Sequence, residues 1–573
     1  MNNSPWFFSL VLVCVLALPR PAHAGTAKNA RAPRCTELTG SAQRNPATSA
    51  NKELCKLIGT GTLAEMRWPS FTDQRGAVEN FYKTAGYALA WTAEASHPTE
   101  QALALIAALQ NADQQGLRPE DYDGPRWADR ISHLQSAGSL SADELARFDL
   151  ALTVSVMRYV SDQYRGRISP NRFQFRWPVK ECDLAEILRT QLVKSSDVAA
   201  TLDRLQPSYP GYRRTLKALH DYVALAKEGE GDPLPVPEKP VWSGDTYAGV
   251  QQLVARLHRL GDLPSGVNLP TGSTLYEDNL KSAVKHFQRR HGLNPDGSLS
   301  PETFKQLTAP LEHRIEQLQL TLELWRWLPA DLKTPWVMVN VPEFRLRAFS
   351  DDRPLLSMSI IAGEAFKHET PMFLDKLEYL IFRPAWHVPL SIQQNEIIPE
   401  LQRHPSYLDK EHFQIYDMRG RVVKVTAIND GILNQLRAGK LEIRQEPGSA
   451  NELGLVKFVF PKQGGVYLHG TLDRDLFGRL RRDFSHGCIR VEDPAALSAW
   501  VLNGDPRWNP QTIDTAMNGD LTMKINLPQS IPVVIFYGTA LVDENGEVYF
   551  SDDIYGYNTA LEQALAKGRP YPE

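Results

Sequence analysis

Long apolar runs are scarce in this chain of 573 residues, and the one clear block is WFFSLVLVCVLAL at residues 6–18. Several membrane-spanning helices are therefore excluded, because each needs about 20 consecutive apolar residues. Cysteine is also rare: five residues are too few for a disulfide-based scaffold. The 63 basic and 67 acidic residues give a net charge of −4, so the chain has no strong positive field that would attract nucleic acid.

Hydrophobic residues make up 42% of the chain and charged residues 23%, which is the ordinary composition of a folded globular protein. This composition excludes a mainly disordered, collagen-like or coiled-coil chain. The length exceeds what one hydrophobic core usually supports, so we expect several domains. The patterns described below predict a multidomain α+β fold with a helical N-terminal scaffold, a small three-helix module and a mostly β domain with an inserted lid.

The N-terminus has the pattern of a secretory signal peptide. Ala22-His23-Ala24 follows the apolar block as a cleavage signature of small residues, so we expect residues 1–24 to be removed. The alternative is an uncleaved membrane anchor, although residues 6–18 are short for a span. Export predicts an oxidising compartment, in which Cys35 and Cys55 could pair.

Composition and periodicity divide the remainder of the chain. Apolar residues at helical spacing predict helices in the N-terminal part and in a compact unit between 245 and 310, whereas β-rich runs separated by turn residues begin after residue 335. The expected units are a flexible lead-in at 25–60, a helical scaffold at 61–240, a three-helix unit at 241–312, a linker helix at 313–335, a mostly β domain at 336–556 with a lid insertion at about 392–455, and a C-terminal tail at 557–573.

Two segments carry residues suited to nucleophilic catalysis: GVYLHGT at 465–471 and FSHGCIR at 484–490. A cysteine nucleophile needs a base that takes its proton, a group that orients this base, and donors for the developing oxyanion. We expect Cys488 to be the nucleophile and His469 the base, with the N–H groups of Gly487 and Cys488 facing the substrate carbonyl. Three basic side chains are expected to favour the thiolate, namely Arg481, Arg482 and Arg490.

Three other interpretations fit Cys488 less well. A buried structural cysteine is the commonest case, but this segment contains histidine, serine and several arginines, which is not a core composition. A zinc site formed by Cys488 with His469 and His486 lacks a fourth ligand at a convincing spacing. A serine hydrolase is disfavoured because the chain contains no G-x-S-x-G motif.

At these residues the sequence resembles a known family. Ser485-His486-Gly487-Cys488-Ile489-Arg490, with His469-Gly470-Thr471 upstream, resembles the active-site signature of L,D-transpeptidases with a YkuD-type domain. Residues 283–293 with Asp296-Gly297 resemble a peptidoglycan-binding module, and further segments spread over residues 75–556 resemble the large periplasmic subgroup. Two residues depart from that subgroup: Gly470 stands where an acidic residue is usual, and Arg383 stands where asparagine is usual.

The resemblance implies a mechanism without metal or organic cofactor. Cys488 would attack the carbonyl between meso-diaminopimelate and the terminal D-alanine of a peptidoglycan tetrapeptide stem, and His469 would protonate the departing D-alanine. The side-chain amine of a second stem would then take the acyl group, which forms a 3→3 crosslink. The main-chain carbonyl of Gly470 would orient the imidazole. The resemblance also implies a periplasmic, wall-associated protein and covalent inhibition by carbapenems.

Four further residues are expected to meet the substrate: His486, Arg490, Ser485 and Trp386. For Arg490 the alternative remains that it only braces the loop. Two other functions stay open at this point, a hydrolytic amidase or endopeptidase and a non-catalytic wall-binding protein. Donor and acceptor stems are the expected partners, other wall-synthesis enzymes are possible ones, and nucleic acid is not expected.

Overall fold

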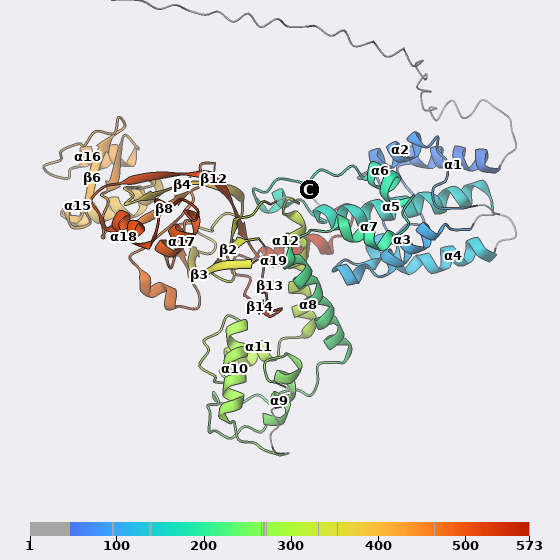
Figure 1. Ribbon diagram of the computed structural model, residues 1–573, viewed down its shortest axis with the longest axis horizontal. Coiled ribbons are helices and arrows are strands. Elements are labelled where there is room, and N and C mark those ends of the chain that lie inside the picture. Colours follow the sequence, from blue (N-terminus) through green and yellow to red (C-terminus); the bar gives the residue numbers. More distant parts are fainter. Residues whose placement is uncertain are drawn as a thin grey trace, which may run out of the picture.

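The computed structural model describes residues 46–571 except 94–96, 137–139, 265, 267–269, 271, 331, 352 and 463–464. Two long helices, α8 (Pro210–Lys227) and α12 (Leu311–Trp327), pack against each other where three lobes meet: a helical lobe, a small helical module and a mostly β lobe (Figure 1). The predicted multidomain α+β architecture is thereby confirmed. The predicted signal peptide and Cys35 lie outside the described residues, and Cys55 is disulfide-bonded.

The helical lobe is built around α5 (Ala142–Arg165), which is buried along most of its length. This helix begins with a capping box, in which the Ser141 hydroxyl accepts from the Glu144 N–H and Glu144 accepts from the Ser141 N–H. Around α5 lie α1 (Pro46–Thr60), α2 (Arg75–Thr84), α3 (Glu100–Gln110), α4 (Trp127–Ser136), α6 (Leu184–Ile187) and α7 (Val198–Leu205). None of the described helices is long and apolar enough to cross a membrane.

The prediction of a flexible lead-in up to residue 60 is wrong for its second half. Residues 46–60 form α1, which packs along α5 and contributes fully buried Leu54 and nearly buried Ile58 to the core of the helical lobe. Lys52, Glu53 and Lys56 make the segment look polar, but its apolar residues recur at Leu54, Leu57 and Ile58, which is helical spacing.

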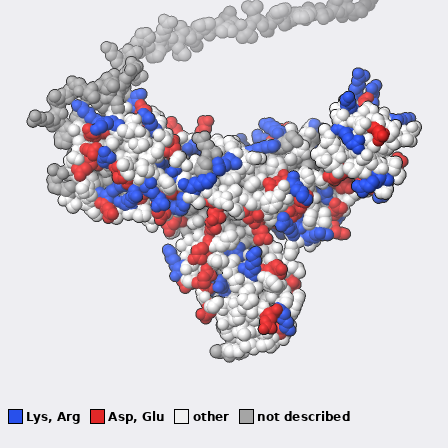
Figure 2. All heavy atoms as spheres, turned by 180° about the vertical axis from the view of Figure 1, so that it is seen from behind, with Lys and Arg blue, Asp and Glu red and all other residues white. Residues whose placement is uncertain are grey.

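The module contains the three predicted helices, α9 (Val250–Arg259), α10 (Asp278–Arg290) and α11 (Pro301–Leu307). Their apolar faces enclose a separate small core that includes Leu253, Leu280 and Phe287. The module lies below the other two lobes in Figure 1. Seen from behind, acidic and basic side chains are interspersed over the molecule, which agrees with the balanced composition (Figure 2).

The β lobe is a nine-stranded mixed sheet with the order β10-β3-β11-β9-β8-β4-β12-β1-β2. Parallel pairing joins β1 with β12, β9 with β11 and β3 with β10, and the other pairs are antiparallel. The strands are β1 (Trp336–Asn340), β2 (Arg345–Ser350), β3 (Arg353–Gly363), β4 (Leu374–Phe382), β8 (Val456–Val459), β9 (Tyr467–His469), β10 (Asp483–Ser485), β11 (Ile489–Val491) and β12 (Met523–Phe536), with α17 (Pro494–Val501) and α18 (Pro510–Asn518) packed on the sheet's core.

The insertion in this lobe is a small subdomain, which we call the inserted subdomain, residues 386–445. Its own sheet has the order β5-β7-β6 and its own core, so it is packed separately from the main sheet. Its elements are β5 (Trp386–His387), α13 (Leu390–Ile392), a π-helical turn (Gln393–Ile397), α14 (Ile398–Arg403), α15 (Tyr407–Lys410), β6 (Phe413–Asp417), α16 (Asp430–Arg437) and β7 (Leu441–Gln445).

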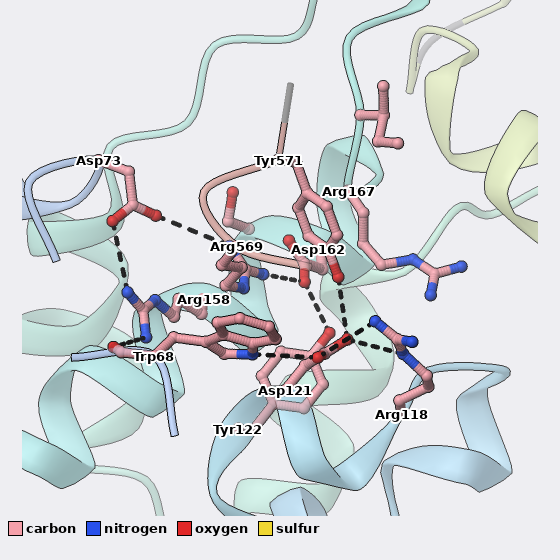
Figure 3. A network of polar contacts seen from close by, with 12 residues as sticks. Trp68, Asp73, Arg118, Asp121, Tyr122, Arg158, Asp162, Arg167, Arg569 and Tyr571 are labelled. Atoms are coloured by element: carbon pink, nitrogen blue, oxygen red, sulfur yellow. Dashed lines mark hydrogen bonds and ion pairs between the residues drawn. The ribbon is translucent and has the colours of Figure 1, made fainter. Parts of the chain in front are cut away.

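Two segments expected to be peripheral are integral to the junction of the lobes. The predicted linker helix corresponds to α12, which is buried along nearly its whole length against α8, α5 and β13 (Ala540–Val542). The predicted tail forms α19 (Tyr557–Ala566) and then enters the helical lobe, where the nine-tenths buried Arg569 forms an ion pair with Asp162 (Figure 3). The Tyr571 hydroxyl donates to Asp121 Oδ2 over 2.9 Å.

Candidate functional site

The sheet brings the two motif segments side by side. β9 and β11 are parallel neighbours, with Leu468 opposite Ile489 and His469 opposite Arg490. Leu468 and Ile489 are fully buried. Because side chains alternate along a strand, His469 and Arg490 lie on the other face, and Cys488, directly before β11, neighbours Tyr467 on β9. The sequence predicted this meeting of histidine and cysteine, and the strand register provides it.

The imidazole of His469 is held in one tautomer. Its Nδ1 lies 2.5 Å from the carbonyl oxygen of Gly470, and because a carbonyl can only accept, Nδ1 carries the proton and Nε2 keeps its lone pair. His469 is 4% exposed. Burial, aided by the Arg490 charge, lowers its pKa to about 3, so the ring is neutral at neutral pH. A neutral imidazole with its lone pair on Nε2 is equipped to accept a proton.

The carbonyl that orients this ring depends on a close backbone approach. Gly454 has φ of +63°, and a Cβ at this position would lie 2.8 Å from the carbonyl carbon of Gly470. Any side chain there would displace the peptide that holds His469. The glycine thus belongs to the site although it carries no functional group.

The Cys488 thiol is partly accessible and lies 3.4 Å from the Gly465 carbonyl oxygen, to which it donates. Burial raises its pKa, and a hydrogen bond with Tyr467 and the positive charges of Lys457 and Arg490 act in the opposite direction. The Lys457 ammonium lies 3.6 Å from the centre of the Tyr467 ring. Neither Tyr467 nor Lys457 was predicted to have a role, although the alternation along 456–459 and 467–469 puts both on the face of His469.

The loop between β10 and β11 is fixed by two hydroxyls, that of Ser485 at its start and that of Thr370 from another part of the β lobe. Gly487 has φ of +101°, its N–H donates to Ser485 Oγ over 3.2 Å, and its carbonyl accepts from Thr370 Oγ1 over 3.1 Å. Ser485, only 3% exposed, also donates to the Cys488 carbonyl. The Ser485 hydroxyl is therefore used inside the loop, and the Gly487 N–H would have to leave it to reach an oxyanion.

Of the three arginines expected to favour the thiolate, Arg490 carries a charge that lowers the pKa of Cys488, and the other two are engaged with other partners. Arg481 forms a two-pronged pair with Asp483, at 2.7 and 2.9 Å, and Arg482 donates to the backbone carbonyls of Phe344, Ile360 and Arg479. Arg490 itself binds Asp473 Oδ2 at 2.5 Å and Thr471 Oγ1 at 3.2 Å. Its guanidinium thus braces the loop after His469 while its charge reaches the thiol.

The remaining candidates lie toward the inserted subdomain. The His486 Nε2 atom is 2.7 Å from Glu396 Oε1, and its ring centre is 4.7 Å from that of His368. Trp386 is half-buried within the inserted subdomain, where its ring centre lies 6.1 Å from that of Phe413. Among the residues that the structure describes, no group of three or more His, Cys, Asp or Glu side chains is arranged to hold a metal ion.

Comparison with known families gives three matches along the chain. Residues 334–510 match the L,D-transpeptidase catalytic domain, residues 246–307 match the "Putative peptidoglycan binding domain", and residues 76–219 match a scaffold domain. The first match lies in the β lobe and ends before β12, the second covers the module, and the third covers most of the helical lobe and part of α8. They confirm the catalytic-domain and wall-binding-module resemblances drawn from the two sequence motifs.

A protein of Haemophilus influenzae named "Putative L,D-transpeptidase" is 30% identical over 229 residues, which are 40% of this chain and 45% of that protein. The match thus spans less than half of the relative's length. A crystal structure of an L,D-transpeptidase fragment from Xylanimonas cellulosilytica is 16% identical and aligns with 53% of this chain and all of that one, with a TM-score of 0.17, too low to support an argument.

Proposed function

We propose that this chain, whose residues 334–510 belong to the L,D-transpeptidase family of catalytic domains, forms 3→3 crosslinks between peptidoglycan stems through a cysteinyl acyl-enzyme. The observation that carries the proposal is the pairing of β9 with β11. This pairing sets the partly accessible Cys488 thiol on the same face as a neutral His469, whose Nε2 lone pair is kept available by the Nδ1–Gly470 hydrogen bond.

In the first half-reaction the Cys488 sulfur attacks the carbonyl between meso-diaminopimelate and the terminal D-alanine, while the thiol proton passes to His469 Nε2. The C–N bond then breaks, D-alanine takes that proton and leaves, and a thioester remains. In the second half-reaction the side-chain amine of another stem attacks the thioester. His469 takes a proton from the amine and returns it to the departing sulfur, which restores the thiol.

Burial keeps the Cys488 thiol and the His469 imidazole neutral until the substrate reacts. Burial disfavours the thiolate and the imidazolium, but proton transfer creates them together, so that each charge stabilises the other. The Tyr467 hydrogen bond and the Lys457 charge add to the stabilisation of negative charge at the sulfur. We assign the Cys488 N–H as the first oxyanion donor, with the Gly487 N–H joining when it leaves Ser485.

The other units fit this chemistry. The module at 246–307 would hold the enzyme on the wall, which agrees with an exported, periplasmic protein. His486, through Glu396, connects the nucleophile loop to the inserted subdomain, which would act as the lid over a bound stem. Trp386 would face a stem from the subdomain's side, and Ser485 would shape the loop from inside.

Mass analysis of products tests the proposal. The mature protein is incubated with disaccharide tetrapeptides, and the expected product is a dimer that has lost one D-alanine. The matched control is His469→Gln, which should give none of this dimer. Monomeric tripeptides without dimers would instead identify a hydrolase, in which water rather than an amine resolves the acyl-enzyme. Absence of any reaction would favour a wall-binding protein.

A further inference from the structure

A cleft of about 550 Å³ lies where the module meets the β lobe. The module supplies the end of α10 and the following turn, residues 286–295, and the β lobe supplies the turn between β1 and β2, the segment 480–482, and residues 547–554. Clefts of this volume at domain junctions are common binding sites. Nothing in the proposed mechanism uses this one, which is separate from Cys488.

The cleft has an apolar floor and a cationic rim. Phe344, Leu293 and Leu480 line it together with prolines, and Leu480 is 48% exposed. The rim carries Arg289, Arg345 and Arg481. The exposed Arg289 side chain makes no ion pair or hydrogen bond with any described residue, and the Arg345 and Arg481 side chains are 41% and 61% exposed.

The acidic residues of the cleft are mostly neutralised within the protein. Glu343 accepts two hydrogen bonds from Arg347, at 2.5 and 2.6 Å, and Glu547 lies 2.5 Å from His286 Nε2. Asp552 is the remaining carboxylate of the lining. Arg289 therefore presents all its donors to an incoming anion, and the guanidinium group matches the geometry of carboxylates. Arg345, which lies 3.6 Å from Glu343 and donates to Ser357, and Arg481, which is bound by Asp483, keep part of their donors free and add positive charge to the rim.

The module and the β lobe, which form the two sides of the cleft, are held together by direct contacts, so the cleft is preformed. Arg290 is bound by Asp262 within the module, at 2.9 and 2.6 Å, and donates to the Val548 carbonyl of the β lobe over 2.9 Å. The His291 ring stacks on Phe550 with 5.4 Å between the ring centres. A ligand thus meets one continuous surface made by two domains.

The β-lobe side of the cleft is continuous in sequence with the loop of the nucleophile. Segment 480–482 continues into β10 and then into the loop with Cys488. Because an extended chain spans about 3.5 Å per residue, Arg481 and Cys488 are at most about 25 Å apart. A long polymer held in the cleft can therefore present one of its branches to the sulfur.

We propose that this cleft binds a segment of a peptidoglycan strand, with stem carboxylates on the rim arginines and apolar faces of the sugars on the floor. The inference rests on the proposed function for its choice of polymer. Wall binding is then a property of the module and the β lobe together, and the module orients the strand as well as retaining it.

Reversing the charge of one arginine on each side of the cleft tests the proposal. Arg289→Glu on the module and Arg345→Glu on the β lobe should each lower binding of the full chain to insoluble sacculi about tenfold. The matched controls are Lys305→Glu on α11 and Arg353→Glu on β3, two exposed residues outside the cleft lining, which should bind like the unmodified chain. Turnover of soluble disaccharide tetrapeptides should stay unchanged in all four variants.

Two results would overturn the proposal. Loss of binding in Arg289→Glu but not in Arg345→Glu would show that the module binds the wall alone, and equal loss in Lys305→Glu would place the site on another face of the module. If the unmodified chain bound sacculi but left soluble stems unreacted, the proposed function would be refuted. The comparison of sacculus binding among the four variants would still show whether the cleft binds the strand.

Discussion

His486 Nε2 lies 2.7 Å from Glu396 Oε1, and this contact joins the loop of the nucleophile to the inserted subdomain. His486 stands two positions before Cys488, and Glu396 belongs to the π-helical turn at Gln393–Ile397. The two side chains are 39% and 48% exposed, so the pair contributes at most about 1 kcal/mol. A contact of this strength can hold a subdomain near the site and still release it.

Glu396→Gln should therefore favour release of the inserted subdomain. Alkylation of Cys488 by a bulky thiol reagent is expected to accelerate up to about fivefold, the factor that corresponds to about 1 kcal/mol. Glu400→Gln is the matched control, because Glu400 pairs at 2.9 Å with Arg403 inside the same subdomain. Equal rates in Glu396→Gln and the unmodified chain would show that the His486 contact does not restrain the subdomain.

The second prediction concerns the nucleophile. Cys488→Ala should fold normally, since little packing is lost, and should lose all acyl transfer because no other group can form the thioester. A carbapenem should add once to the unmodified chain and not at all to Cys488→Ala, as measured by intact mass. Cys182→Ala controls for the other free, half-buried cysteine among the described residues and should keep the adduct. An adduct on Cys488→Ala would refute the cysteine mechanism.

The third prediction concerns Tyr467, whose hydrogen bond lowers the pKa of the Cys488 thiol against the effect of burial. Both the backbone and the side chain of Tyr467 form hydrogen bonds with this thiol, and Tyr467→Phe removes only the side-chain one. The thiol pKa should therefore rise, and alkylation by iodoacetamide at neutral pH should slow by up to about tenfold, as expected for a hydrogen bond to a charged group. Tyr379→Phe is the control, since Tyr379 also carries a lysine, Lys524, 3.7 Å from its ring centre but stands on β4, two strands beyond β9 in the sheet. An unchanged alkylation rate in Tyr467→Phe would show that the Tyr467 hydroxyl does not act on the thiol.

The fourth prediction concerns the pH dependence of acylation. Burial lowers the pKa of His469 to about 3, so the neutral form that accepts a proton persists down to about that pH. Carbapenem acylation should therefore show no decline centred near pH 6.5, the ordinary value for histidine. A decline centred near that pH in the rate of acylation would contradict this assignment.

The motifs and the strand-forming segments were predictable because they are local. The runs around 336–340 and 456–459 and the three module helices follow from periodicity, and His469 and Cys488 follow from the chemistry of their motifs. Partners across the sheet were not predictable: Lys457 reaches the site through its pairing opposite His469. The burial of α1 on α5 and the entry of Arg569 into the helical lobe depend on contacts between residues far apart in sequence.

The last prediction concerns that C-terminal contact. Arg569 is buried, and its guanidinium is paired with Asp162 and lies 3.7 Å from Asp73 (Figure 3). Arg569→Met would leave Asp162 buried with the Tyr122 hydroxyl as its remaining partner, at 2.6 Å. Breaking a buried pair in this way costs about 3–5 kcal/mol, so the melting temperature of the helical lobe should fall clearly.

Arg507→Met is the matched control, because Arg507 pairs with Asp505 on the surface and its side chain is 75% exposed. Its melting temperature should change little, since solvent screens an exposed ion pair and leaves it a small contribution to stability. Adding Asp162→Asn to Arg569→Met removes the uncompensated charge and should restore part of the loss. A double variant as unstable as the single one would mean that packing of the Arg569 stem, rather than its charge, fastens the chain end to the helical lobe.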